Sequence, residues 1–234
     1  MIVLHTMERS YPWGTLRSTF SSKTKVVLEE KGLPYRVERV RIGDVWKKVP
    51  EVLAKNPLGK VPWIEDGEIT IYDSSVINEY LNDRHPEPPL LPVDPVARAR
   101  ARALENYADE IILSVHVPRI WMPLWSPPDQ RDNAAIAKAR AELGERALPF
   151  VEERLEGREY LADAFSLADV PFMSLAMVLQ VDGMSLDGLP NLAAYLERLR
   201  QRPSYRAIDP RTSLEESAGS AGRTPETHNE ATHA

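Results

Sequence analysis

Two short stretches of the sequence carry groups that could contact a ligand. In the first, Val61 precedes Pro62 at the head of an expected strand. Because proline donates no backbone hydrogen bond, it marks a strand start or edge, and we expect the Val61 amide and carbonyl to face outward, unpaired. In the second, Asp73 and Ser74 open an expected helix, where free amides and the helix dipole favour an anion. The sequence therefore predicts an exposed strand edge and an anion-binding helix start.

Several common chemistries are excluded. The chain contains no cysteine, so it has no disulfide, no thiolate metal ligand and no cysteine nucleophile of its own. Its five histidines show no paired spacing of the kind that binds zinc. Neither a nucleophile-elbow serine motif nor a phosphate-binding glycine loop occurs. We expect no metal site, and any reactive sulfur has to arrive with a ligand.

Composition narrows the class of protein further. The 234 residues carry a formal net charge of −6, which does not favour binding to nucleic acid or to an anionic membrane. No apolar run approaches the ~18 residues of a spanning helix. The N-terminus lacks a basic segment followed by a long apolar run, so we expect no secretory signal. These features predict a cytoplasmic protein with a sizeable core.

In the first part of the chain, expected strands and helices follow one another as in a small α/β domain. The Asp66-Gly67 pair is a strong signal for a β-hairpin. In the helix that follows Asp73, the residues Val76, Ile77, Tyr80 and Leu81 are expected to share one face. The expected strands are 2–6, 34–42, 61–65 and 68–72, and the expected helices are 18–31 and 75–84, with an irregular helical turn at 47–55.

Composition changes sharply after this domain. Residues 86–95 contain five prolines and predict a stiff, extended linker. Residues 96–208 show helical periodicity throughout, whereas residues 209–234 are polar and are expected to be disordered. We therefore predict an α/β domain at 1–85, a linker, an all-helical domain and a tail.

Four sequence blocks occur one after another along these predicted domains. They are EEKGLPY (29–35), PEVLAKNPLGKVPWIEDG (50–67), YDSSVINEYL (72–81) and FSLADV (165–170). Together with the element order, these blocks resemble the glutathione S-transferase family over residues 1–208. The resemblance implies a thioredoxin-like domain of βαβ-ββα order joined to a helical bundle, with glutathione as co-substrate and a homodimeric assembly.

The resemblance also assigns glutathione contacts. In that family the bond before the matching proline is cis, and the residue before it pairs through its backbone with the cysteinyl part of glutathione. These roles fall to Pro62 and Val61 here, so that the tripeptide adds as a short extra strand. Asp73 and Ser74 would bind the γ-glutamyl group, although the family usually has Glu or Gln at the position of Asp73. The basic residues placed to hold the glycyl carboxylate are Lys47, Lys48 and Lys60.

A hydroxyl group is needed to activate the thiol of glutathione. A thiol of this kind has a pKa of ~8.5, and a hydroxyl donor at a helix N-terminus favours its thiolate. Ser18, eleven residues before Glu29, lies where serine-type relatives place that hydroxyl. The stretch 7–17 is longer than the usual turn, so Tyr11 and Ser21 remain rival donors.

The long first loop followed by STFSSKTK is similar to the bacterial β-etherases and their fungal relatives. Those enzymes use glutathione to displace an aryloxide from a lignin-type aryl ether. The second substrate is therefore expected to be an apolar, aromatic electrophile bound between the domains. Candidate pocket residues are Trp13, Tyr107, Ile111 and Val115, although aromatic and aliphatic residues at helical spacing equally suit a core.

These observations predict a glutathione transferase of the detoxifying type. One alternative is a glutathione-dependent isomerase or peroxidase that uses the same site. Another is a non-catalytic protein of the same fold that binds glutathione or another ligand, or that serves as an interaction module.

Overall fold

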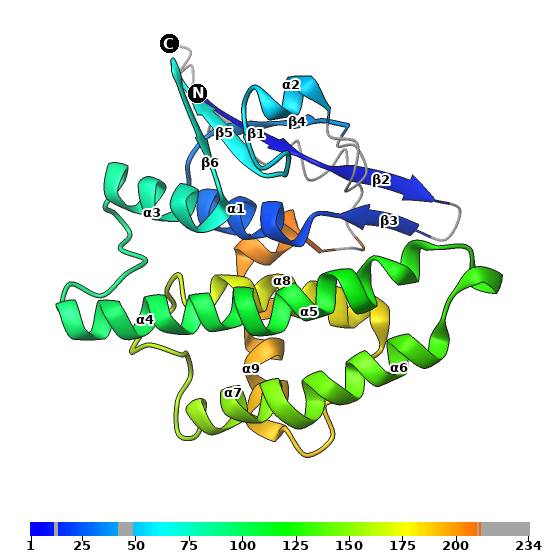
Figure 1. Ribbon diagram of the computed structural model, residues 1–234. Helices are drawn as coiled ribbons and strands as arrows, with labels where there is room; N and C mark the ends of the chain where they lie inside the picture. Colours follow the sequence, from blue (N-terminus) through cyan, green and yellow to red (C-terminus); the bar gives the residue numbers. More distant parts are fainter. Residues whose placement is uncertain (12–13, 42–48, 210, 212–234) are drawn as a thin grey trace, which may run out of the picture.

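An α/β domain and an all-helical domain pack against each other in the chain (Figure 1). The computed structural model describes residues 1–11, 14–41, 49–209 and 211. The expected tail falls outside the described residues from 212 onward. The predicted fold class, a thioredoxin-like domain followed by a helical domain, is confirmed.

The α/β domain is built on a four-stranded mixed sheet in the order β4-β1-β5-β6. The parallel pair β1–β4 and the antiparallel hairpin β5–β6 meet at β1, which pairs with β5 in antiparallel register. Leu4 and Ile64 face each other across that pairing and are fully buried. The strands are β1 (Ile2–Thr6), β4 (Tyr35–Arg39), β5 (Trp63–Asp66) and β6 (Ile69–Tyr72).

Two helices of this domain lie between the sheet and the helical domain, whereas a short third helix lies on the other side of the sheet (Figure 1). The inner pair carries the expected caps, because Ser18 precedes one helix and Asp73 the other. The helices are α1 (Thr19–Glu30) and α3 (Ser74–Arg84) on the inner side, and α2 (Pro50–Leu53) on the outer side.

An additional hairpin occupies the loop between β1 and α1, which the sequence indicated only as unusually long. The side chain of Glu8 at its base bonds to Lys25 of α1 at 3.0 Å and to Arg39 of β4 at 2.9 Å. Burial alone would raise the pKa of Glu8, but these two cations hold it below the usual value. Its strands are β2 (Glu8–Tyr11) and β3 (Gly14–Arg17).

The proline-rich linker is fixed to the helical domain. Leu90 and Leu91 are buried, and the Leu90 carbonyl accepts a hydrogen bond from the Leu167 amide at 2.8 Å. The helices that follow are α4 (Pro95–Tyr107), α5 (Ser114–His116), α6 (Asn133–Glu142), α7 (Leu148–Arg154), α8 (Val170–Asp182) and α9 (Pro190–Arg200). None of the described helices is long and apolar enough to cross a bilayer.

Two of the long helical runs contain π-helical segments. Ala108–Leu113 joins α4 to α5, Val117–Trp121 follows α5, and Leu143–Ala147 joins α6 to α7. A π-helical turn holds more residues than an α-helical turn, so the residues after it face a different direction from that given by α-helical spacing. This shift decides which residues of the segment after α4 face the α/β domain.

Helix α8 is the centre of the helical domain and packs against α1 (Figure 1). All of its residues from Val170 to Leu179 are buried. Asp169, just before it, accepts hydrogen bonds from the Leu161 amide at 3.0 Å, the Ser166 amide at 2.8 Å and the Tyr195 hydroxyl at 2.7 Å. The buried carboxylate therefore fixes the chain that leads into α8.

Candidate functional site

A pocket of about 440 Å³ opens between the two domains. Phe20 of α1 forms part of the pocket wall. From the rest of the α/β domain the lining residues are Asn56, Leu58, Lys60, Val61, Pro62, Asp73 and Ser74. From the helical domain they are Asp109, Glu110, Leu113, Ser114, Val117 and Pro118.

The floor of the pocket contains the Val61-Pro62 bond, which is cis as the resemblance implied. No hydrogen bond joins the Val61 backbone to any other described residue, so its amide and carbonyl are available to an extended ligand. Asn56 shapes the loop just before this bond: its amide group donates to the Lys60 carbonyl at 2.8 Å and its side-chain oxygen accepts from the Leu58 amide at 2.9 Å. The sequence analysis assigns no role to Asn56, although Asn56 begins an Asn-Pro-Leu-Gly segment that is typical of a turn.

The first turn of α3 forms the second part of the pocket. Asp73 has φ = 73°, a conformation that non-glycine residues rarely adopt and that often marks a functional position. Its carboxylate accepts hydrogen bonds from the amides of Ser75 at 3.0 Å and Val76 at 3.2 Å. Ser74 is buried, and its hydroxyl bonds to none of the described residues. The capped helix start thus presents one free hydroxyl to the pocket.

The predicted basic residues are only partly described. Lys60 lines the pocket with an exposed side chain, and its ammonium has no ion-pair partner among residues that the structure describes. Lys47 and Lys48 lie outside the described residues, as does Trp13. The side chain of Tyr11 is also outside what is described.

Ser18 does not belong to the pocket lining, but it stands at the start of the helix that contributes Phe20. Its hydroxyl oxygen accepts a hydrogen bond from the Ser21 amide at 3.2 Å as the N-cap of α1. A hydroxyl can accept and donate at the same time, so this cap leaves the Ser18 proton free for another acceptor. The rival Ser21 is buried, and its hydroxyl lacks a hydrogen-bond partner among the described residues.

The three other expected substrate residues do not line this pocket. Tyr107 instead donates a hydrogen bond to the Ala147 carbonyl at 3.0 Å, and its ring packs at a tilt against Phe150. Ile111 is 45% exposed, and Val115 packs against the core. The pocket wall is supplied by neighbouring residues of the π-helical segment and α5, which include two carboxylates and one hydroxyl.

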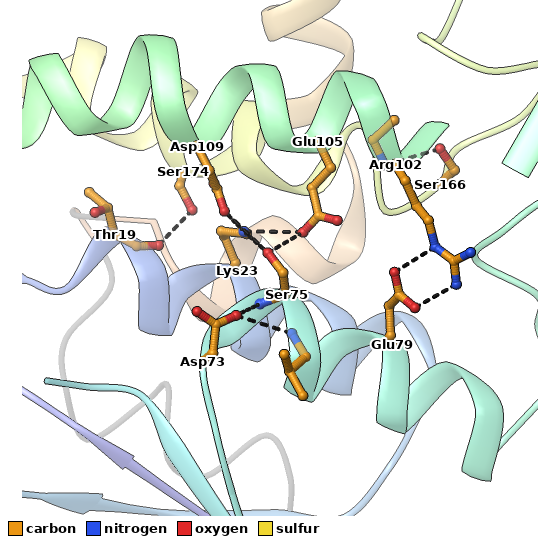
Figure 2. A network of polar contacts seen from close by, with 12 residues as sticks. Thr19, Lys23, Asp73, Ser75, Glu79, Arg102, Glu105, Asp109, Ser166 and Ser174 are labelled. Carbon is orange, nitrogen blue, oxygen red and sulfur yellow. Dashed lines mark hydrogen bonds and ion pairs between the residues drawn. The ribbon is translucent and has the colours of Figure 1, made fainter. Parts of the chain in front are cut away.

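A buried charge cluster lies beside the pocket and joins the two domains (Figure 2). Lys23 of α1 is fully buried, and its ammonium lies 3.2 Å from Glu105, 2.5 Å from Asp109 and 3.1 Å from the Ser75 hydroxyl. The Ser75 hydroxyl in turn donates to Glu105 at 2.9 Å. One cation thus holds α1, α3 and the α4 segment together.

One carboxylate of the cluster, that of Asp109, also lines the pocket. Asp109 uses Oδ2 for Lys23, while its Oδ1 is buried and has no hydrogen-bond partner among the described residues. Burial raises the pKa of Glu105, and Lys23 and Ser75 oppose that shift.

A second link between α3 and α4 is the two-point ion pair of Arg102 with Glu79, at 2.7 and 2.6 Å.

The described residues contain no cluster of side chains suited to ligate a metal ion. No group of three His, Cys, Asp or Glu side chains there is arranged to hold an ion.

The fold and this pocket define a two-domain protein that combines a thioredoxin-like domain with a helical domain. The family described as "Glutathione S-transferase, N-terminal domain" matches residues 17–84, and "Glutathione S-transferase, C-terminal domain" matches residues 113–203. Glutathione S-transferase 4 of Zea mays is 30% identical over 210 residues, which cover 85% of this chain and 90% of the maize protein. The chain belongs to the glutathione S-transferase family.

Two further relatives show the range of similar proteins. The stringent starvation protein A homolog of Pasteurella multocida is 29% identical over 200 residues, covering 82% of this chain and 89% of that protein. The crystal structure of a theta class glutathione S-transferase from Xanthomonas axonopodis pv. citri, with glutathione bound, has a TM-score of 0.73 at 26% identity. That comparison covers 91% of this chain and 98% of the other.

Replacing Lys23 by Met tests the buried cluster. The variant leaves Glu105 and Asp109 beside each other in a buried site without their cation, and we expect it to lose about 3–5 kcal/mol of unfolding free energy. The additional change Glu105→Gln should recover part of that loss by removing one of the two negative charges. Urea unfolding followed by circular dichroism measures both.

The matched control is Lys138→Met, because Lys138 is exposed on α6 and makes no ion pair within the described part of the chain. It should change stability by less than about 0.5 kcal/mol. A Lys23→Met protein as stable as the wild type would show that the cluster does not hold the domains together.

Proposed function

We propose that the chain is a glutathione transferase that binds glutathione in the pocket between its domains. The observation that carries this proposal is the meeting of five residues chosen from sequence in one pocket: Lys60, Val61, Pro62, Asp73 and Ser74. Crystal structures of family members with bound glutathione support the choice of ligand.

Each part of the tripeptide has a matching group in the pocket. The unpaired backbone of Val61 offers an amide and a carbonyl to the cysteinyl residue, in the manner of an added strand. The α3 N-terminus and the free Ser74 hydroxyl suit the γ-glutamyl carboxylate. The ammonium of Lys60 suits the glycyl carboxylate. Lys47 and Lys48 remain further candidates for that last contact.

The reaction follows from how the thiol is activated. The Ser18 hydroxyl, with its oxygen already fixed by the Ser21 amide, donates its proton in a hydrogen bond to the glutathione sulfur and stabilises the thiolate. The α1 N-terminus adds the favourable end of the helix dipole. The thiolate then forms a bond to an electrophilic carbon, and the leaving group departs with the electron pair of the bond that breaks.

The part of the pocket wall proposed to contact the second substrate is partly apolar and partly acidic. Phe20, Leu113 and Val117 supply apolar surface, whereas Asp109 and Glu110 supply hydrogen-bond acceptors. This combination suits an aromatic electrophile that carries hydroxyl or other donor groups better than a wholly apolar one. A phenolic aryl ether, the type of substrate implied by the resemblance of the first loop and STFSSKTK to β-etherases, has both features.

A second candidate function is a non-catalytic ligand-binding or interaction protein. It is favoured by the similarity to proteins named for starvation rather than for an enzymatic reaction, and by the absence of Ser18 from the pocket lining. Glutathione binding without turnover of a chlorodinitrobenzene or an aryl ether would establish this candidate in place of the transferase.

A homodimer is also proposed, on the basis of an apolar edge of the α/β domain. Ile69 and Tyr72 of the edge strand β6 are 47% and 39% exposed, and Val76 of α3 is 55% exposed. Of the four α3 residues expected to share one face, Ile77 and Leu81 are fully buried, whereas Val76 is exposed. Exposed apolar residues that gather into a patch commonly mark protein contacts, and we propose that these residues belong to such a contact.

Light scattering tests the dimer. The wild type should have twice the mass of one chain, and Val76→Asp should shift it towards the monomer, because a carboxylate would be desolvated in the interface. The control Val93→Asp, at an 84% exposed linker position, should leave the mass unchanged. A wild-type monomer at micromolar concentration would exclude the dimer.

Ser18→Ala tests the proposed thiol activation. Loss of a hydrogen bond to an anion costs about 1.5–3 kcal/mol, so the pKa of bound glutathione should rise by about one to two units. Turnover of chlorodinitrobenzene at neutral pH should fall about 10- to 100-fold. The thiolate absorbance of bound glutathione, titrated against pH, gives the pKa directly.

Two further variants separate catalysis from helix capping. Ser18→Thr keeps both the cap and the hydroxyl and should retain most of the activity. Ser22→Ala is the matched control, because the Ser22 hydroxyl is already bonded to the Ser18 carbonyl at 3.0 Å. If glutathione still binds to Ser18→Ala with an unchanged thiol pKa, Ser18 is not the donor to the glutathione sulfur, and Ser21 or Tyr11 would be the donor instead.

A further inference from the structure

The wall that the helical domain gives to the pocket is left for the second substrate. The groups assigned above to the tripeptide, from Lys60 to Ser74, all belong to the α/β domain. The opposite wall comes from the π-helical segment after α4, from α5 and from the start of the next π-helical segment. What this wall recognises therefore decides which electrophile the protein accepts, so the inference below rests on the proposed function.

The two carboxylates of this wall differ in how their charge is matched. The Asp109 carboxylate lies 2.5 Å from the buried Lys23 ammonium, so its negative charge is largely offset. Glu110 is exposed, lines the same pocket and forms no ion pair with any residue that the structure describes. Glu110 thus carries the unmatched charge of the wall.

The other described residues that the helical domain contributes to this wall are uncharged. Leu113, Val117 and Pro118 are apolar, and the hydroxyl of Ser114 donates to the Glu110 carbonyl within the helix. Across from them, Phe20 of α1 adds an aromatic ring. The pocket therefore offers a ligand an apolar surface together with one negative charge.

Two further observations bear on the charge of the ligand. Ser74, on the α/β side of the pocket, is 5% exposed and its hydroxyl has no partner among the described residues, which marks the pocket as a ligand site independently of the acidic wall. Glutathione also adds negative charge when it binds, because its thiolate and two carboxylates outnumber its one ammonium group. Lys60 and the α3 N-terminus offset the carboxylates, but the thiolate remains beside the second substrate.

We propose that the second substrate is cationic: an aromatic electrophile whose flat body lies on Phe20, Leu113 and Val117 and whose ammonium group pairs with Glu110. An anionic electrophile of the same shape is disfavoured, because it would place a like charge next to the Glu110 carboxylate. Glu110 selects among substrates by charge and takes no part in making or breaking bonds.

The test uses three chloronitrobenzamides that share one reactive ring and differ only at the end of a short side arm, which is an ammonium, a hydroxyl or a carboxylate. In each of them the glutathione thiolate bonds to the ring carbon that carries chlorine, and chloride departs with the electron pair of the carbon–chlorine bond. The full chain is assayed at saturating glutathione. Each kcat/KM is divided by the rate constant of the uncatalysed reaction with the thiolate.

The wild type should prefer the ammonium compound to the carboxylate compound about tenfold, with the hydroxyl compound between them, because one gains an exposed ion pair and the other meets a like charge. Added salt should lower this ratio by screening the charges. Glu110→Gln should bring the ratio close to one, and Glu110→Lys should reverse the preference.

The matched control is Glu145→Gln, because Glu145 is exposed in another π-helical segment of the same domain and does not line the pocket. It should keep the wild-type ratio. A ratio that changes as much in Glu145→Gln as in Glu110→Gln would show that the net charge of the protein, and not Glu110, sets the preference, and would overturn the inference.

Calorimetry with the three preformed glutathione conjugates separates this inference from the proposed function. If the hydroxyl conjugate binds but the protein does not form it, the transferase proposal fails, and the affinities of the conjugates should still follow the order ammonium, hydroxyl, carboxylate. Equal values for the ammonium and carboxylate compounds, a preference that Glu110→Gln leaves unchanged, or no binding of any conjugate would overturn the inference.

Discussion

The arrangement of the two domains depends on one buried positive charge. An unpaired lysine cannot be held in a protein interior at low cost, so Lys23 requires carboxylates within ion-pair distance. Those carboxylates, Glu105 and Asp109, come from the helical domain, whereas the Ser75 hydroxyl comes from α3 (Figure 2). Any sliding of one domain along the other would break this pairing. The cluster thus favours one relative position of the domains, and with it one shape of the pocket between them.

The same cluster links the fold to the chemistry of the site. Ser75 follows Asp73 and Ser74 in the first turn of α3, and Asp109 also lines the pocket. Asp109 lies in a π-helical segment, which directs its side chain and those of Glu110 and Leu113 towards the α/β domain. The pocket is therefore built where irregular backbone occurs on both sides: a positive φ at Asp73 on one and a π-helical run on the other.

Much of the α/β domain could be predicted from the sequence, because local signals determined it. The Asp66-Gly67 turn, the Ser18 and Asp73 caps and the apolar strands are all features of a few neighbouring residues. The hairpin β2–β3 could not be predicted, since long-range pairs such as Glu8 with Lys25 and Arg39 stabilise it. The sequence also does not predict which residues of the π-helical segment after α4 are buried and which are exposed. An α-helical spacing groups Ile111 with Tyr107, whereas the π-helical turn buries Ile112 and Leu113 and exposes Ile111.

Isothermal titration calorimetry with reduced glutathione tests the central claim most directly. The account predicts a saturable heat with one site per chain in the folded, full-length protein, and weaker binding when Ser74 is changed to Ala while the unfolding transition is unchanged. No heat and no saturation up to tens of millimolar glutathione, from a protein shown to be folded, would contradict it.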